Sequence, residues 1–128
     1  MMTKKEISIL RKVQKQIQSE IDGKKHYYKD KNGKRRLLFF KLDTWFHESD
    51  CGTVACIAGH ICVNEKINLG VISLDAVALF NYDLRGELRT LFDPWNRGLS
   101  SPYWIGLNFN SKADVITAIE RFIEINEK

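Results

Sequence analysis

The first forty residues change from a helical to a strand-like pattern of apolar positions. Between residues 4 and 22, apolar side chains recur every three or four positions and form one stripe, while basic residues lie on roughly the opposite face. Thr3 and Glu6 flank the start of this stripe with the spacing of a capping box, and Gly23 follows its end. The pattern predicts an amphipathic helix over about residues 4 to 22.

The strand-like part surrounds a turn signal. Residues 26 to 40 carry aromatic and aliphatic side chains on both sides of Asn32-Gly33, and aromatic residues favour strands. Asn-Gly favours a two-residue type I′ turn, because both residues accept a positive φ. We predict a β-hairpin over about residues 26 to 40 with a basic, exposed tip. A bare hairpin is marginally stable in water, so its aromatic face is expected to pack against helices.

Residues 54 to 65 would be apolar on every side of a helix. Ala55, Ala58, Gly59 and Cys62 would form a stripe of small side chains along it. A helix without a polar face is typical of the centre of a fold, and small side chains let a neighbouring helix or the hairpin approach closely. We therefore predict a buried central helix over residues 54–65.

The rest of the chain completes a helical pattern. Two short amphipathic segments follow, then an irregular stretch with both prolines, and Ser111 opens a last helix. The irregular stretch carries Trp95, Tyr103 and Trp104, which suggest a binding site, although such loops more often bury their own aromatic side chains. The pattern predicts a single domain over residues 1–128, mainly α with a minor β part (α+β minor). About five helices would surround the central helix 54–65, with one β-hairpin near residues 26–40.

Composition narrows the function classes. The 128 residues are 44% hydrophobic and 28% charged. No apolar run approaches the ~20 residues of a membrane span, and the first residues lack the apolar core and cleavage site of a signal peptide. The three cysteines are an odd number crowded into one segment, unlike a secreted disulfide framework. We expect a soluble, intracellular protein of the cytoplasm with no membrane partner.

The cysteines and two histidines raise the question of a metal. His47, Cys51, Cys56 and His60 lie within one short segment, and Cys56 and His60 would share one helical face. All four are ligand types that zinc accepts. The spacing lacks the paired C-x2-C or H-x3-H form of common zinc sites. These residues are therefore candidates only, and we expect no metal and no cofactor.

A cysteine nucleophile is a second interpretation of the segment. Cys51 would lie near the start of the central helix, where the helix dipole favours a thiolate, and His47 or His60 would be its base. The third interpretation is structural: free cysteine is often buried as a small apolar residue, and a histidine of a buried helix is more often hydrogen-bonded in the core. We favour the structural interpretation and expect no enzymatic activity, with catalysis by Cys51 as the alternative.

The same segment resembles a group of small uncharacterised proteins encoded by bacteriophages and bacteria. The likeness rests on Leu42-Asp43-Thr44-Trp45 followed by the string CGTVACIAG at residues 51 to 59, with weaker similarity to about residue 125. The group has no assigned activity, so the resemblance transfers no catalytic or binding residue. Some versions in the group carry Trp after the final Gly of the string, where this chain has His60, which argues against an obligatory role for that histidine. The resemblance implies a phage-type protein.

Charge is distributed unevenly along the chain. Residues 1–36 carry twelve Lys and Arg against four Asp and Glu, a net charge of +8, whereas residues 37–128 carry eight against twelve, a net of −4. The residues expected to bind a partner are Lys24, Lys25, Tyr27, Tyr28, Lys29, Lys31, Lys34, Arg35 and Arg36. Cations attract phosphates or carboxylates, and aromatic rings stack on bases. We expect a small interaction protein of unknown activity that binds an acidic protein or a nucleic acid, with a possible host-modulating or anti-defence role.

Overall fold

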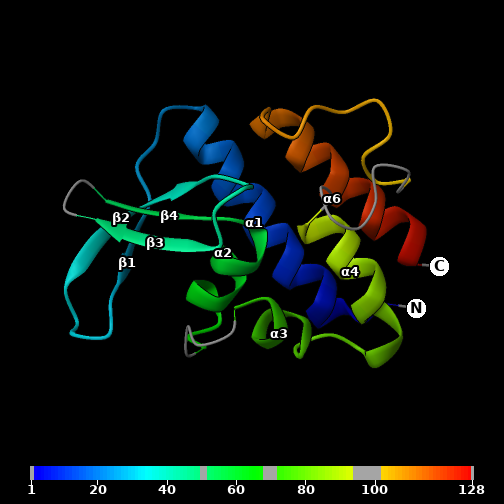
Figure 1. Cartoon of the computed structure of the whole chain (residues 1–128), viewed down its shortest axis with the longest axis horizontal. Helices are drawn as coiled ribbons and strands as arrows, with labels where there is room; N and C mark the ends of the chain where they lie inside the picture. The colour runs from blue at the N-terminus through cyan, green and yellow to red at the C-terminus, as the bar shows by residue number, and fades with distance from the viewer. Residues whose placement is uncertain (1, 50–51, 68–71, 94–101, 128) are drawn as a thin grey trace.

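A computed structural model of the chain describes residues 2–49, 52–67, 72–93 and 102–127. Figure 1 shows the strands gathered at one end of the molecule and helices α4 and α6 at the other, near both termini. In chain order the elements are α1 (Lys4–Ile21), β1 (Tyr27–Lys29), β2 (Arg35–Phe40), β3 (Phe46–Ser49), β4 (Gly52–Ala55), α2 (Ile57–Asn64), α3 (Ile72–Val77), the 3-10 turn η1 (Tyr82–Leu84), α4 (Arg85–Phe92) and α6 (Lys112–Asn126).

The fold is α+β, so the expected mainly α fold with a single hairpin is wrong. A four-stranded mixed sheet has the order β1-β2-β4-β3, in which β2 and β4 are parallel and the other pairs are antiparallel. The expected helix 54–65 is also wrong at its start, because residues 52–55 form β4 and the helix begins only at Ile57. A short apolar run fits a strand and a buried helix equally well. Here the β-branched Thr53 and Val54 complete the sheet between β2 and β3.

Helix α2 does lie at the centre of the molecule. Its residues from Ile57 to Cys62 are all buried. Gly59 is required at its position, because a Cβ atom built there would lie 2.2 Å from the carbonyl oxygen of Trp45 and 2.8 Å from the Cβ atom of Ala55. Gly59 thus allows the chain entering β3 to pass directly over the helix. The sequence interpretation had expected a helix or the hairpin in this place, and it had counted Ala55, which belongs to β4, in the helical stripe.

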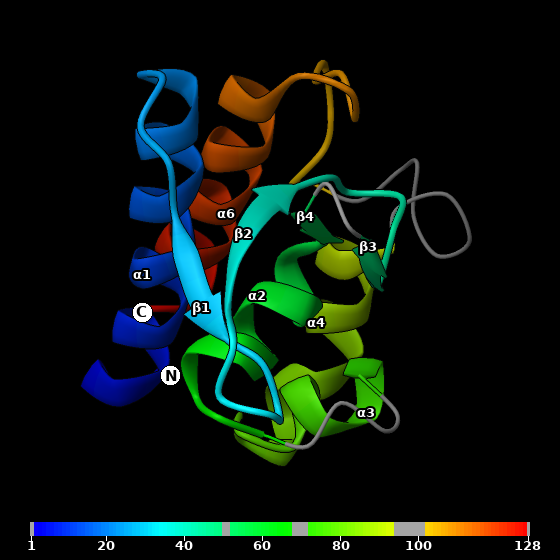
Figure 2. The same ribbon diagram turned by 90° about the vertical axis from the view of Figure 1, so that its left-hand side faces the viewer.

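Helix α1 connects the helical end to the sheet. Its cap is the predicted capping box, in which Glu6 accepts from the Thr3 amide at 2.7 Å and donates its own amide to the Thr3 hydroxyl at 3.2 Å. Two views show α1 and α6 side by side (Figures 1 and 2). At the far end of α1, the Glu20 carboxylate accepts the Phe40 amide of β2 at 2.8 Å. The helix therefore fixes the position of β2.

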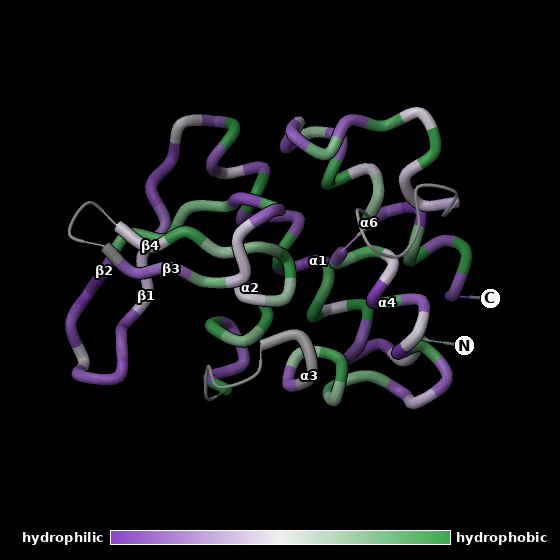
Figure 3. The backbone as a smooth tube through the Cα atoms, in the orientation of Figure 1, coloured by the Kyte–Doolittle hydropathy of each residue, from purple (hydrophilic) through white to green (hydrophobic). Residues whose placement is uncertain are grey.

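The predicted hairpin is present, but its turn differs from the type I′ turn expected. Of the two turn residues only Gly33 has a positive φ, at 78°. The amides of Asn32 and Lys34 both donate to the Asp30 side chain at 2.9 Å. An aspartate that collects amides in this way stabilises a longer loop. The tip consequently spans residues 30 to 34, and it is among the most hydrophilic parts of the backbone in Figure 3.

Candidate functional site

Alternation along the strands divides the expected binding residues between the two faces of the sheet. Tyr27 pairs with Leu37, and Tyr28 pairs with Arg36. Successive side chains of a strand point to opposite faces. The outer face therefore carries Tyr27, Lys29, Arg35, Leu37, Phe39, His47 and Val54, and the inner face carries Tyr28, Arg36, Leu38, Phe40, Phe46, Glu48, Thr53 and Ala55.

On the inner face, Tyr28 and Arg36 are engaged within the protein. The Tyr28 hydroxyl is 2.8 Å from the Thr53 hydroxyl, and burial raises the pKa of Tyr28 above its usual value. The Arg36 guanidinium lies 2.7 Å from the Asp30 carboxylate and 3.4 Å from Glu48. Its hydrogen bond to Asp30 lowers the pKa of that carboxyl. Tyr28 thus connects β1 to β4, and Arg36 connects β2 to the hairpin loop and to β3.

The outer face exposes aromatic rings beside a cation. Tyr27 is 38% exposed and Phe39 is 37% exposed. The Arg35 guanidinium lies over the Tyr27 ring, 3.9 Å from its centroid, within the range of a cation–π contact. A Cβ atom at Gly52 would lie 2.7 Å from the Phe39 ring, so the glycine leaves room for this ring against β4. The arrangement is an open platform of rings on a rigid sheet.

Lysines surround this platform. The side chains at Lys24, Lys25, Lys29, Lys31 and Lys34 are all exposed. None of the five takes part in an ion pair with another described residue. The outer face and the hairpin loops are thus positively charged, and these charges are available to a partner.

Three of the four candidate metal ligands and catalytic residues, His47, Cys56 and His60, lie among the residues that the structure describes. Cys51 lies outside the described residues. The helix N-terminus invoked to activate it is not at its position, because β4 begins at Gly52 and helix α2 begins at Ile57. His47 is exposed on β3, whereas Cys56 and His60 are buried at the start of α2. Within the described ranges, no three His, Cys, Asp or Glu side chains gather as a metal site would require.

The chemistry of the buried residues is that of a core. Burial raises the pKa of the Cys56 thiol to about 12 and lowers the pKa of His60 to about 4. The His60 ring donates from Nδ1 to the Cys56 carbonyl at 3.0 Å and packs against Phe40. At neutral pH the thiol is protonated and the imidazole uncharged, so this pair supplies neither a thiolate nor a cation.

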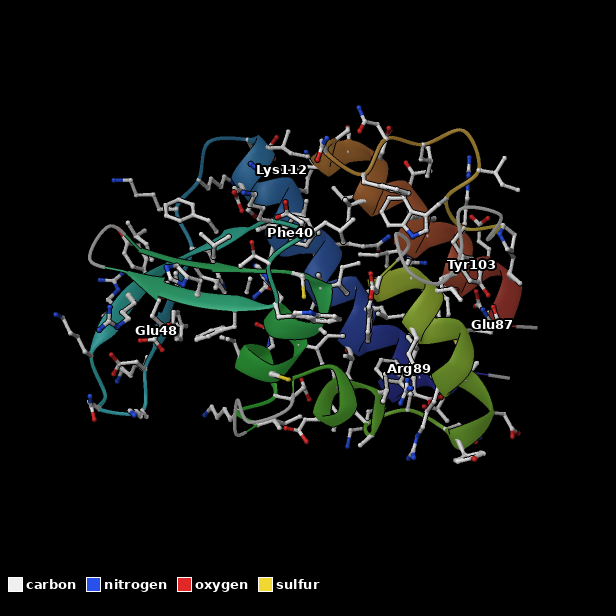
Figure 4. All side chains as sticks on the ribbon, in the orientation of Figure 1. Phe40, Glu48, Glu87, Arg89, Tyr103 and Lys112 are labelled. Carbon is white, nitrogen blue, oxygen red and sulfur yellow. The ribbon has the colours of Figure 1, made fainter. Side chains whose placement is uncertain are left out.

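The aromatic loop is also buried where it is described. Tyr103 is 1% and Trp104 is 3% exposed. Tyr103 donates its hydroxyl to Glu87 at 2.7 Å, a pair labelled in Figure 4. Trp95 lies outside the described residues. The interpretation that the loop buries its own aromatic side chains is confirmed for Tyr103 and Trp104.

Sequence reasoning missed Phe39 and Val54 as surface residues. The string RRLLFF of β2 carries similar residues in adjacent pairs, so period-two alternation is hidden. The pairing of Tyr27 with Leu37 puts Phe39, two residues further along β2, on the same face as Tyr27. The pairing of Phe39 with Val54 then adds Val54 of β4 to that face. Only the register across three strands identifies the platform.

Searches of protein-family models, curated proteins and solved structures find no match to this chain. The resemblance to phage-encoded proteins therefore stays a prediction. None of the helices in the described ranges is long and apolar enough to cross a membrane.

Proposed function

We propose that the protein binds single-stranded nucleic acid on the outer face of its sheet. The observation that carries this proposal is the pair of half-exposed rings, Tyr27 and Phe39, on a sheet face that also holds Arg35 over the Tyr27 ring. Unpaired bases expose flat faces that stack on aromatic side chains, and several RNA-binding modules use open sheets in this way. The surrounding lysines would follow the phosphates.

The single-stranded form is favoured over duplex by the shape of the face. The described elements present aromatic rings across β1 and β2 of a four-stranded sheet, which is wider than the helix or two-stranded ribbon that a major groove admits. Bases of a duplex are stacked on each other and offer no free faces to such rings. A duplex would therefore use only the cations and bind more weakly.

An acidic protein is the alternative partner, because carboxylates would also be attracted to the lysines. It would make less use of the rings, since carboxylates do not stack. The phage-type origin, and with it a host-modulating or anti-defence role, remains part of this proposal and is supported by the resemblance alone. The cysteine-dependent enzyme is not favoured, because its premise of a helix start at Cys51 is lost.

The test is fluorescence anisotropy with labelled single-stranded DNA and RNA, the matching duplexes, and polyglutamate as competitor. Tyr27→Ala should weaken single-strand binding by roughly 5- to 150-fold, the range for loss of one stacked base. Phe39→Leu keeps the apolar bulk over Gly52 while removing the π face, and should weaken binding by about fivefold or more.

A matched control is present elsewhere on the surface. Tyr82 is 79% exposed with Arg85 over its ring at 5.5 Å, but it belongs to η1. Tyr82→Ala should leave binding unchanged. If Tyr27→Ala and Phe39→Leu bind as tightly as the unaltered protein, the platform is not used, and competition by polyglutamate would then favour the acidic-protein partner.

A further inference from the structure

A cleft lies on the inner side of the hairpin, opposite the face that carries Tyr27 and Phe39. The cleft, of about 780 Å³, separates the inner side of the hairpin from the C-terminal part of α2. Its volume is in the range of small-molecule sites, about 300 to 1,000 Å³. It is lined by inner-face residues of β1 and β3, by the start of the hairpin loop from Lys29 to Lys31, and by residues between Cys62 and Ile67. The outer-face rings of Tyr27 and Phe39 are not among the lining residues. The two surfaces are separated by the thickness of the sheet.

One wall of the cleft is aromatic and aliphatic. Tyr28 and Phe46 line it with their rings edge to face, 6.2 Å between centroids, and Val63 of α2 lies among the lining residues. The Tyr28 hydroxyl bonds to Thr53 and so fixes the ring. Rigid aromatic walls of this kind favour a flat ring system.

The mouth of the cleft has an excess of positive charge. Lys29, Lys31 and Lys66 line it and make no ion pair with a described residue. The two carboxylates in the lining, Asp30 and Glu48, share Arg36 at 2.7 and 3.4 Å; Glu48 is labelled in Figure 4. Because Arg36 neutralises much of their charge, the lysines dominate the field that a ligand meets.

Lys66 occupies a position that normally belongs to glycine. Its φ is 57°, and it is the one described residue other than glycine with a positive φ. The Ile67 amide donates to the Cys62 carbonyl at 2.9 Å, and the Lys66 amide donates to Val63 at 3.3 Å, which is the Schellman pattern that ends many helices. A residue with a Cβ is disfavoured in this conformation. A lysine at this position makes the end of α2 less stable than a glycine would, and it places a cation at the cleft.

We propose that this cleft binds a nucleoside monophosphate group, with the base against Tyr28 and Phe46 and the phosphate between Lys31 and Lys66. The group can come from a free nucleotide or from the 5′ end of a strand. This inference does not depend on the outer face, because a free nucleotide reaches the cleft without it.

The experiment is isothermal titration calorimetry with adenosine 5′-monophosphate, adenosine and inorganic phosphate. The monophosphate should bind more tightly than either part alone. Lys66→Asn keeps a residue tolerant of positive φ and removes the charge, and it should weaken monophosphate binding roughly tenfold, as expected for loss of a charge-assisted hydrogen bond. Lys5→Ala, on the exposed N-terminal turn of α1 and outside the cleft, should leave it unchanged.

A second arm separates the sources of the group. If an oligonucleotide with a 5′ phosphate binds more tightly than its 5′-hydroxyl form, and Lys66→Asn abolishes the difference, the cleft accepts a strand end. If the two forms bind alike while the free monophosphate binds, the ligand is a free nucleotide. The inference is overturned if millimolar monophosphate gives no binding heat, if Lys66→Asn binds it as tightly as the unaltered protein, or if inorganic phosphate alone binds equally well.

Discussion

Replacing Gly59 by alanine tests the packing of the sheet on α2. A Cβ at this position would lie 2.2 Å from the Trp45 carbonyl oxygen, and a backbone atom cannot rotate away as a side chain does. The chain before β3 must therefore move outward from the helix. Overpacking of this kind costs about 1–3 kcal/mol, and a rigid neighbour puts the cost near the top of that range. Replacing glycine within a helix returns about 1 kcal/mol of helix propensity.

The expected net effect of Gly59→Ala is a loss of about 2 kcal/mol in the free energy of unfolding. Gly86→Ala is the matched control, because Gly86 lies in α4 with nothing within 4 Å of the added Cβ. That variant should gain about 0.5–1 kcal/mol. Urea denaturation followed by circular dichroism measures both changes as opposite shifts of the midpoint. If Gly59→Ala is as stable as the unaltered protein, the contact between Trp45 and α2 is refuted.

Three further outcomes follow from named contacts. Lys66→Gly should raise the free energy of unfolding by about 0.5–1 kcal/mol in thermal melts, because left-handed strain of about 1–2 kcal/mol is relieved against the entropy cost of glycine; an unchanged or lowered stability would contradict the strain. The hydrogen bond from Arg11 lowers the pKa of Glu120 below its usual value, so the stability that the ionised carboxylate contributes is present at neutral pH and is lost as the pH falls through the folded-state pKa. Glu120→Gln should therefore show a flatter stability profile below pH 5, and an equally steep acid loss would refute this assignment. Burial raises the pKa values of Cys56 and Cys62 to about 12 and about 11, so peptide mapping after iodoacetamide treatment at pH 8 should find both thiols unmodified until the protein is denatured, and rapid native labelling would disprove their burial.

The sequence was sufficient for elements whose pattern is long and one-sided. The apolar stripe of α1, its Thr3–Glu6 cap and the Ser111 cap of α6 depend on neighbours close in the chain, and all three are present. The position of the hairpin also follows from the local pattern, although its turn type does not, because the Asp30 side chain binds the loop amides. These features are decided within a few residues, so the pattern alone identifies them.

Strands β3 and β4 could not be predicted in this way. Each has only four residues, and Val54 and Ala55 suit a buried helix as well as a strand. Their state is decided by pairing with β2, which is parallel to β4 and lies beyond an intervening strand in the sequence. Such non-local pairing leaves no mark on the local pattern.

The sequence predicted the positive charge of the candidate site, but it did not predict which of its side chains share one face of the sheet. The basic, aromatic segment from Lys24 to Arg36 was evident, but its division into an outer and an inner face required the strand register. That register places Tyr28 and Arg36 on the inner face, where both side chains make bonds within the protein. It also added Phe39, which the sequence analysis had not singled out as a binding residue.

The most direct test of the outer face as a nucleic-acid platform is a titration of the isotopically labelled protein with a single-stranded oligonucleotide, followed by amide proton–nitrogen correlation spectra. Binding on the platform predicts shifts that concentrate at Tyr27, Arg35, Phe39 and Val54, with smaller shifts at 200 mM than at 50 mM salt, as counterion release requires. Spectra that do not change, or shifts confined to residues around Tyr82 on η1, would contradict the account.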